Sequence, residues 1–129
     1  MNDVGRATDG LSGIARLTRA VRVGLTALAW AFRNEEAFRL EVLGAVVLLP
    51  LGFWLGYGGV ERALLLVAVL QVLMVELLNT GIEVVVDRIS IERHALSGLA
   101  KDLGSAAVMF SLFIASTIWG LILIPRFFG

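Results

Sequence analysis

The fold of this chain is decided by one stretch, Val75-Glu76-Leu77-Leu78-Asn79-Thr80-Gly81-Ile82-Glu83-Val84-Val85-Val86-Asp87-Arg88. It is apolar enough for a membrane helix, yet it contains three carboxylates and an asparagine. At about 100° per residue, the polar side chains from Glu76 to Asp87 share one helical stripe, and Leu, Ile and Val occupy the rest. An ionised carboxylate at membrane depth costs about 2.5 kcal/mol or more. We therefore expect the stripe to face protein, water or a metal ion, and a polar seam that only joins helices is the alternative.

The composition indicates a membrane protein. Of the 129 residues, 58% are hydrophobic, whereas soluble domains usually have about 45–50%. The length predicts a single domain over residues 1–129. The absence of cysteine excludes a disulfide framework and a cysteine metal site. The formal net charge of zero gives no general attraction for nucleic acid.

Six of the 11 basic residues, all arginines, precede the apolar segments. Residues 1–10 are polar and predict a disordered tail. Residues 11–33 have apolar side chains at three- and four-residue steps and arginines on the opposite face. This pattern, just before a membrane span, predicts a helix lying in the headgroup plane. A surface helix packed on a soluble core is the alternative, but the composition offers no such core.

Three apolar segments predict transmembrane helices at 42–60, 63–86 and 103–125. The first contains Pro50, which membrane helices tolerate, and a short turn at Glu61-Arg62 leads to the second. The second becomes polar only from Glu76, so its carboxylates lie near one interface. The predicted fold class is an all-α membrane protein with three transmembrane helices and an N-terminal amphipathic surface helix.

The basic residues predict the orientation in the membrane. Of the 11 Lys and Arg residues, only Arg62 and Arg126 lie on the side opposite to the N-terminal segment. The excess of positive charge predicts that the N-terminus and the acidic end of the second span are cytoplasmic and that the C-terminus is outside. The acidic stripe then faces the compartment that contains ATP.

The spacing of the carboxylates favours a division of roles. Glu76 and Glu83 are about 10 Å apart along a helix, too far to share one ion easily. A deeper carboxylate would accept a proton from a lipid hydroxyl, and a shallower one would hold Mg²⁺, which usually takes one or two carboxylates together with phosphate oxygens. Glu35 or Glu41 would supply a second carboxylate. The chain has no Walker loop or protein-kinase motif, so these residues favour a membrane enzyme acting on an amphiphile without naming its reaction.

The run from Glu76 to Asp87 resembles the signature of the prokaryotic integral-membrane diacylglycerol kinases. The resemblance extends to Asn34-Glu35-Glu36-Ala37-Phe38-Arg39, to Asp87-Arg88-Ile89 and to the run from His94 to Val108, and covers residues 16–120. It implies a homotrimer with active sites shared between subunits, in the bacterial inner membrane. It also implies transfer of phosphate from ATP, with Mg²⁺, to 1,2-diacylglycerol, which gives phosphatidic acid and ADP.

The resemblance also implies roles for individual residues. Glu76 would be the general base on the lipid hydroxyl, with Asn79 supporting the catalytic centre, and the metal ligands would be Glu35 and Glu83. The nucleotide-binding positions would be Arg16, Glu35, Glu83, Glu92, Arg93, His94, Lys101 and Asp102. The substrate-binding positions would be Arg16, Ala37, Phe38, Arg39, Glu41, Glu76, Ser105 and Trp119.

Two other functions remain open from the sequence. An undecaprenol kinase of the same superfamily would use the same chemistry on a different lipid, although the run from Leu96 to Val108 favours diacylglycerol. An oligomeric ion or proton conduit would line its path with Glu76 and Glu83. A conduit needs polarity along the whole helix, whereas the outer half of this span offers little beyond Gln71.

Overall fold

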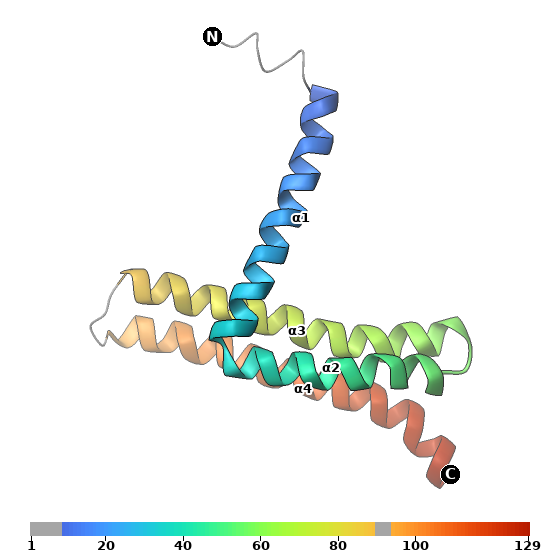
Figure 1. The fold of residues 1–129 in the computed structure, drawn as a ribbon. Helices are drawn as coiled ribbons and strands as arrows, with labels where there is room; N and C mark the ends of the chain where they lie inside the picture. Colours follow the sequence, from blue (N-terminus) through green and yellow to red (C-terminus); the bar gives the residue numbers. More distant parts are fainter. Residues whose placement is uncertain (1–8, 90–93) are drawn as a thin grey trace.

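The protein is an all-helical bundle with one projecting helix. The structure, a computed structural model, describes residues 9–89 and 94–129, and side chains from residue 12 onward within those ranges. Within them the helices are α1 (Asp9–Asn34), α2 (Glu36–Leu55), α3 (Gly58–Ile89) and α4 (Ala95–Phe128). Helices α2, α3 and α4 run side by side, and α1 rises steeply from the bundle (Figure 1). The predicted all-helical architecture is confirmed, and α2, α3 and α4 are each long and apolar enough to cross a membrane.

The helix ends differ from the predicted spans in an informative way. Helix α2 begins at Glu36 and ends at Leu55, whereas the predicted span was 42–60. Gly56 leaves the helical conformation, and Gly58 adopts φ +79°, a left-handed conformation that glycine tolerates best. Helices α3 and α4 extend beyond 63–86 and 103–125 at both ends of the bundle. Hydropathy marks only the part of a helix that suits hydrocarbon, and these helices continue past it because they pack on each other.

Helix α3 is the centre of the bundle, since it packs against both α2 and α4. Its buried residues recur at three- and four-residue steps, so they form one face. They are Leu65, Ala68, Val69, Val72, Glu76, Asn79 and Thr80. The buried face is therefore apolar over its first half and polar over its second, and the polar half is the stripe singled out in the sequence.

Polar side chains also join α4 to α3 within the apolar part of the bundle. The Gln71 amide donates hydrogen bonds to the carbonyls of Ser111 at 2.7 Å and Ala68 at 2.9 Å. The Trp119 indole donates to the carbonyl of Leu65 at 3.1 Å. A backbone carbonyl inside a helix keeps a second lone pair free, so the bonds of Gln71 to Ser111 and of Trp119 to Leu65 link α3 and α4 without breaking either helix.

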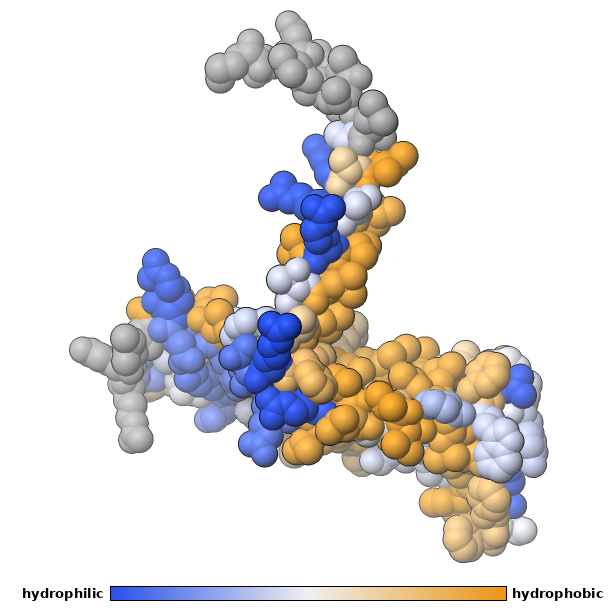
Figure 2. Space-filling model, in the orientation of Figure 1, coloured by the Kyte–Doolittle hydropathy of each residue, from blue (hydrophilic) through white to orange (hydrophobic). Residues whose placement is uncertain are grey.

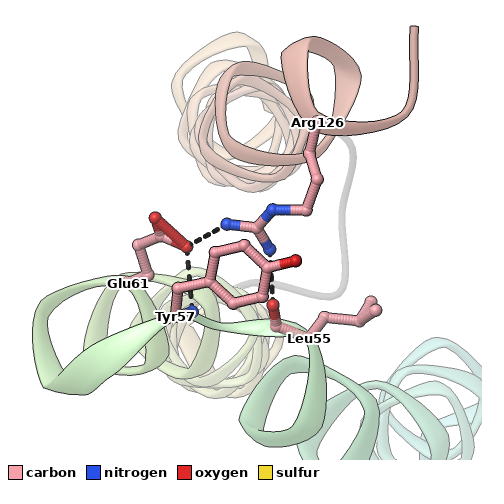
Figure 3. A network of polar contacts seen from close by, with 4 residues as sticks. All are labelled: Leu55, Tyr57, Glu61 and Arg126. Atoms are coloured by element: carbon pink, nitrogen blue, oxygen red, sulfur yellow. Dashed lines mark hydrogen bonds and ion pairs between the residues drawn. The ribbon is translucent and has the colours of Figure 1, made fainter.

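A polar network closes the end of the bundle that is remote from α1 (Figure 3). Arg126, in the last turn of α4, forms an ion pair with Glu61 and donates to the carbonyl of Leu55, the last residue of α2. Its guanidinium lies 3.5 Å from the centre of the Tyr57 ring. The Tyr57 backbone N–H donates to Glu61 at 3.0 Å. Only 15% of the Arg126 side chain is exposed, so this network ties α4 to the turn between α2 and α3.

We expect Arg126→Ala to lower the unfolding temperature, because it removes the ion pair with Glu61 and the hydrogen bond to the Leu55 carbonyl. Thermal unfolding in detergent micelles would measure the effect. Arg19→Ala, which removes an exposed arginine of α1, is the control and should leave the unfolding temperature unchanged. If the losses of Arg126→Ala and Glu61→Ala simply add in the double variant, the two side chains are not coupled.

Candidate active site

The first part of the polar stripe of α3 is buried within the chain at the end where α1 joins the bundle, whereas Asp87 at its far end is exposed. Glu76, Asn79 and Thr80 are 6–7% exposed, although charged and amide side chains are rarely buried without a partner. Figure 2 shows hydrophilic side chains gathered at this junction and at the adjoining ends of α3 and α4, with a smaller group at the opposite end. Most of the remaining bundle surface in this view is apolar, as a membrane location requires.

Four carboxylates from three different segments meet around this stripe. The charge of Glu76 acts on Glu41, and Glu83 and Glu35 act on Glu76. In the described part of the chain the ion pairs are Lys101 with Asp87, and Arg126 with Glu61, so none of the four carboxylates is neutralised by a salt bridge there. Clustered carboxylates repel one another unless a cation or a proton lies among them. A cation would relieve this repulsion, although no three His, Cys, Asp or Glu side chains of the described residues lie close enough together to hold a metal ion by themselves.

Glu35 reaches this cluster because of its place in the chain. It is the one non-helical residue between α1 and α2, with φ −113° and ψ 110°. Its backbone N–H donates to Ala31 at 2.8 Å, and its carbonyl accepts from Arg39 at 3.0 Å, so the bend itself is hydrogen-bonded. The Glu35 side chain forms no capping hydrogen bond at the start of α2. Its carboxylate thus remains available to a ligand.

An apolar groove leads away from the carboxylates between α2, α3 and α4. The cavity has a volume of about 360 Å³. Glu41 of α2 and Trp119 of α4 both line it, and Glu41 marks its inner end, the end nearest to Glu76. The other lining residues are Gly44, Ala45, Leu48, Val69, Val72, Leu73, Leu112, Ala115 and Ser116. One oxygen of Glu41, Oε2, is buried without a hydrogen-bond donor among the described residues. The groove therefore combines an apolar wall with one carboxylate next to Glu76.

Comparison with known proteins identifies the family. The sequence pattern described as prokaryotic diacylglycerol kinase matches residues 22–123. The chain is 47% identical over 112 residues to the diacylglycerol kinase of Haemophilus influenzae, and the aligned region covers 87% of this chain and 95% of that protein. The diacylglycerol kinases of Pseudomonas aeruginosa and Escherichia coli are 46% and 40% identical, over 89% and 90% of this chain and 94% and 95% of their own lengths. The chain belongs to the prokaryotic diacylglycerol kinase family. The predicted family resemblance is confirmed.

Of the residues implied to bind the nucleotide in this family, Lys101 and Glu83 lie at the polar end of the bundle. The Lys101 ammonium pairs with Asp87 at 2.6 Å and lies within electrostatic range of Glu83. Asp102 is exposed near Lys101 on α4. His94 precedes α4, and its Nδ1 accepts a hydrogen bond from the N–H of Leu96 at 3.1 Å. Glu92 and Arg93 lie outside the described residues.

Arg16 is the predicted site residue that a single chain does not bring to the carboxylates. It is exposed on α1. Arg16 and Glu35 are separated by an almost uninterrupted helix, which places them about 28 Å apart along its axis. Figure 1 shows α1 leading away from the bundle over this length. Within one chain, Arg16 and Glu35 therefore do not lie in the same site.

The residues implied to bind the lipid fall into two groups. Glu41 and Trp119 line the groove, whereas Ser105 and Ala37 are exposed. Phe38 is only 3% exposed and packs at the bend between α1 and α2. Arg39 donates from Nε to the carbonyl of Phe32 at 3.0 Å and from a terminal nitrogen to the carbonyl of Arg33 at 2.8 Å. Its guanidinium therefore holds the last turn of α1, a structural role that the sequence pattern alone does not reveal.

Some contributors to this site carry no signal in the sequence. The apolar lining residues Val69, Val72 and Ala115 look like any other residue of a membrane span. Asp87 was placed on the polar stripe, but its ion pair with Lys101 joins residues 14 positions apart. The short connection between α3 and α4 places Asp87 and Lys101 at the same end of the bundle. Their direct pairing depends on the register of the two helices, which the sequence does not reveal.

We expect Arg39→Ala to loosen the junction of α1 and α2, because two backbone carbonyls lose hydrogen bonds worth about 0.5–1.5 kcal/mol each. Hydrogen–deuterium exchange should show faster exchange at residues 32–36. Arg33→Ala is the matched control, since it removes a neighbouring guanidinium and keeps the Arg33 carbonyl that Arg39 binds. Equal exchange in the two variants would contradict this role for Arg39.

Proposed function

We propose that this lipid kinase transfers the γ-phosphoryl group of ATP to the free hydroxyl of 1,2-diacylglycerol, and produces phosphatidic acid and ADP. The observation that carries the proposal is the buried carboxylate of Glu76 beside Glu41, at the inner end of an apolar groove. A groove of this kind suits an acyl chain, and the carboxylates suit the polar glycerol end. Membership of the prokaryotic diacylglycerol kinase family supports the same reaction.

Glu76 is the proposed general base. Its carboxylate accepts the proton of the lipid hydroxyl while the hydroxyl oxygen forms a bond to the γ-phosphorus. The bond between the γ-phosphorus and the oxygen that bridges it to the β-phosphorus breaks at the same time, and ADP leaves. Burial keeps Glu76 away from bulk water, so that the bound lipid rather than water is deprotonated. Asn79 supports the centre by its contacts with Glu76 and Glu83.

Glu35 and Glu83 are the proposed ligands of Mg²⁺. Within residues 9–89 and 94–129, no three His, Cys, Asp or Glu side chains come together as a complete metal site. Mg²⁺ does not need such a site, since it usually takes one or two carboxylates, and phosphate oxygens and water complete its shell. Both carboxylates are hard oxygen donors without a salt bridge in the described chain. Bound there, Mg²⁺ would neutralise charge on the nucleotide phosphates.

The nucleotide would lie at the cytoplasmic end of α3 and α4. Lys101 provides a cation for its phosphates, and we propose that Asp102, His94, Glu92 and Arg93 complete its binding site around the start of α4. Arg16 would contribute from α1. Nine of the 11 basic residues lie in the first 39 positions or between positions 88 and 101, which supports a cytoplasmic N-terminus and an external C-terminus in the bacterial inner membrane.

A homotrimer with shared active sites is part of the proposal. In the 18-residue apolar segment of α3, 39% of residues are buried within the chain, whereas in that of α4 only 6% are. Helix α4 thus offers a long apolar face to other copies. The distance of Arg16 from Glu35 also favours sharing, because an α1 lying along the membrane surface would reach a neighbouring bundle. Figure 2 shows the hydrophilic and apolar sides that this position of α1 needs.

The first test offers diacylglycerol and undecaprenol side by side in mixed micelles, with radiolabelled ATP and Mg²⁺. We expect strong labelling of diacylglycerol. In the same assay, Glu76→Gln should lose at least about 100-fold in kcat, the contribution typical of a general base, and should still bind ATP. Labelling of undecaprenol alone would replace the lipid in this proposal. Full turnover by Glu76→Gln would exclude Glu76 as the base.

A metal titration tests the proposed ligands. We expect Glu35→Gln and Glu83→Gln to require a higher Mg²⁺ concentration for half-maximal activity, because an amide oxygen binds the hard cation more weakly than a carboxylate does. Glu36→Gln, the exposed neighbour of Glu35, is the control and should keep the wild-type titration curve. Unchanged curves in the first two variants would rule out their assignment as ligands.

A further inference from the structure

Gly104 of α4 lies directly against Asn79 of α3. Gly104 is buried, and a Cβ atom placed on it would overlap the Asn79 side-chain oxygen and lie 3.3 Å from Asn79 Cγ. Such an atom would also lie 3.8 Å from Ile82 Cδ1. By contrast, a Cβ atom on Gly81 or Gly98, in the same two helices, would meet nothing within 4 Å. The close approach of α4 to the polar stripe therefore depends on glycine at this position.

The Asn79 amide has different neighbours at its two ends. Its Nδ2 donates to Glu83 Oε1 at 3.4 Å, and the amide also interacts with Glu76. Its Oδ1 is buried and has no N–H or O–H donor among the described residues. The Gly104 hydrogen that stands in place of a side chain points at this oxygen, a Cα–H···O contact of the kind that recurs at helix interfaces.

This arrangement fixes which way the amide faces. Ionised carboxylates only accept hydrogen bonds, whereas the amide nitrogen only donates them. A rotated amide would set its oxygen against Glu83 and Glu76, which would repel it, and would set its NH₂ group against the α4 backbone. The orientation with Oδ1 toward Gly104 is therefore the favourable one. It is accessible only while α4 has no side chain at this point.

We propose that Gly104 is a positioning residue for the phosphoryl transfer proposed above: by leaving room for the Asn79 carbonyl oxygen, it turns the Asn79 NH₂ group toward the catalytic and metal-binding carboxylates. The inference rests on the proposed function for its catalytic consequence. The contact between Gly104 and Asn79 does not depend on it. A methyl group at position 104 must displace the Asn79 side chain, which breaks its contact with Glu83, or push α4 away from the polar stripe of α3.

The test compares Gly104→Ala in the wild-type chain and in an Asn79→Ala background. In the wild-type chain we expect kcat to fall at least about tenfold, because a contact made at the reacting centre is lost. The Mg²⁺ concentration for half-maximal activity should rise, and the KM for the lipid should stay unchanged. In the Asn79→Ala background the same substitution should cost less than about twofold, since the group that it displaces is already absent.

Gly120→Ala is the matched control. It makes the same change in the same helix, and its Cβ would meet only Ile124, at an ordinary 3.7 Å. It should keep wild-type activity and metal dependence. Wild-type kinetics in Gly104→Ala would overturn the proposal. An equal loss of activity in both backgrounds would also overturn it, because it would show a general packing effect that does not act through Asn79.

Thermal unfolding of the wild-type chain, Gly104→Ala, Asn79→Ala and the double variant gives a readout that is independent of catalysis. If Gly104→Ala folds poorly, the double variant should recover the unfolding temperature of Asn79→Ala, because removal of the amide makes room for the methyl group. A double variant as unstable as Gly104→Ala would overturn the inference. If the wild-type chain labels no lipid, the proposed function fails, whereas the unfolding measurements still decide whether Gly104 and Asn79 are coupled.

Discussion

The pairing of α3 with α4 is the constraint on which the rest of the structure depends. The two helices are joined by ion pairs at both ends, Asp87 with Lys101 and Glu61 with Arg126. Between these ends the Gln71 amide bonds the Ser111 carbonyl. Inside a bilayer, apolar contact between helices gains little over contact with lipid, so hydrogen bonds and close packing must set the register. The register in turn decides which residue of α4 faces each polar group of α3.

Burial of Glu76 follows from this register. The buried face of α3 changes from apolar to polar at Glu76, and α2 and α4 cover both halves. The protein thus bears the cost of desolvating a carboxylate, which is several kcal/mol for an isolated ion even after relaxation. Nothing in the packing of α3 requires that cost, since leucine or valine would fill the same face. A buried carboxylate without a salt bridge, next to an apolar groove, is what the proposed reaction on a lipid hydroxyl needs.

The sequence predicted the parts of this arrangement that follow from periodicity. The polar stripe, the all-helical fold and the apolar segments depend on spacing within one helix, which a single sequence reveals. Contacts between helices depend on register and were not predictable. The family resemblance implied that Arg39 binds the lipid. In the structure its guanidinium donates to the carbonyls of Phe32 and Arg33, a contact that the sequence did not indicate. Gly104 was one small residue among several in its helix, and only its position opposite Asn79 distinguishes it.

Within a single chain, the negative charges that the proposed phosphoryl transfer uses lie together, whereas the positive charges do not. It gathers Glu35, Glu41, Glu76 and Glu83 at one junction, whereas Lys101 is already paired with Asp87 and Arg16 is remote on α1. Negative charge alone repels a nucleoside triphosphate, so in the proposed reaction the balancing positive charge would come from a metal ion and from a neighbouring subunit. The proposed sharing of sites in a trimer then has a physical cause. Each bundle would supply the carboxylates, and the surface helix of another copy would supply the arginine that completes the balance.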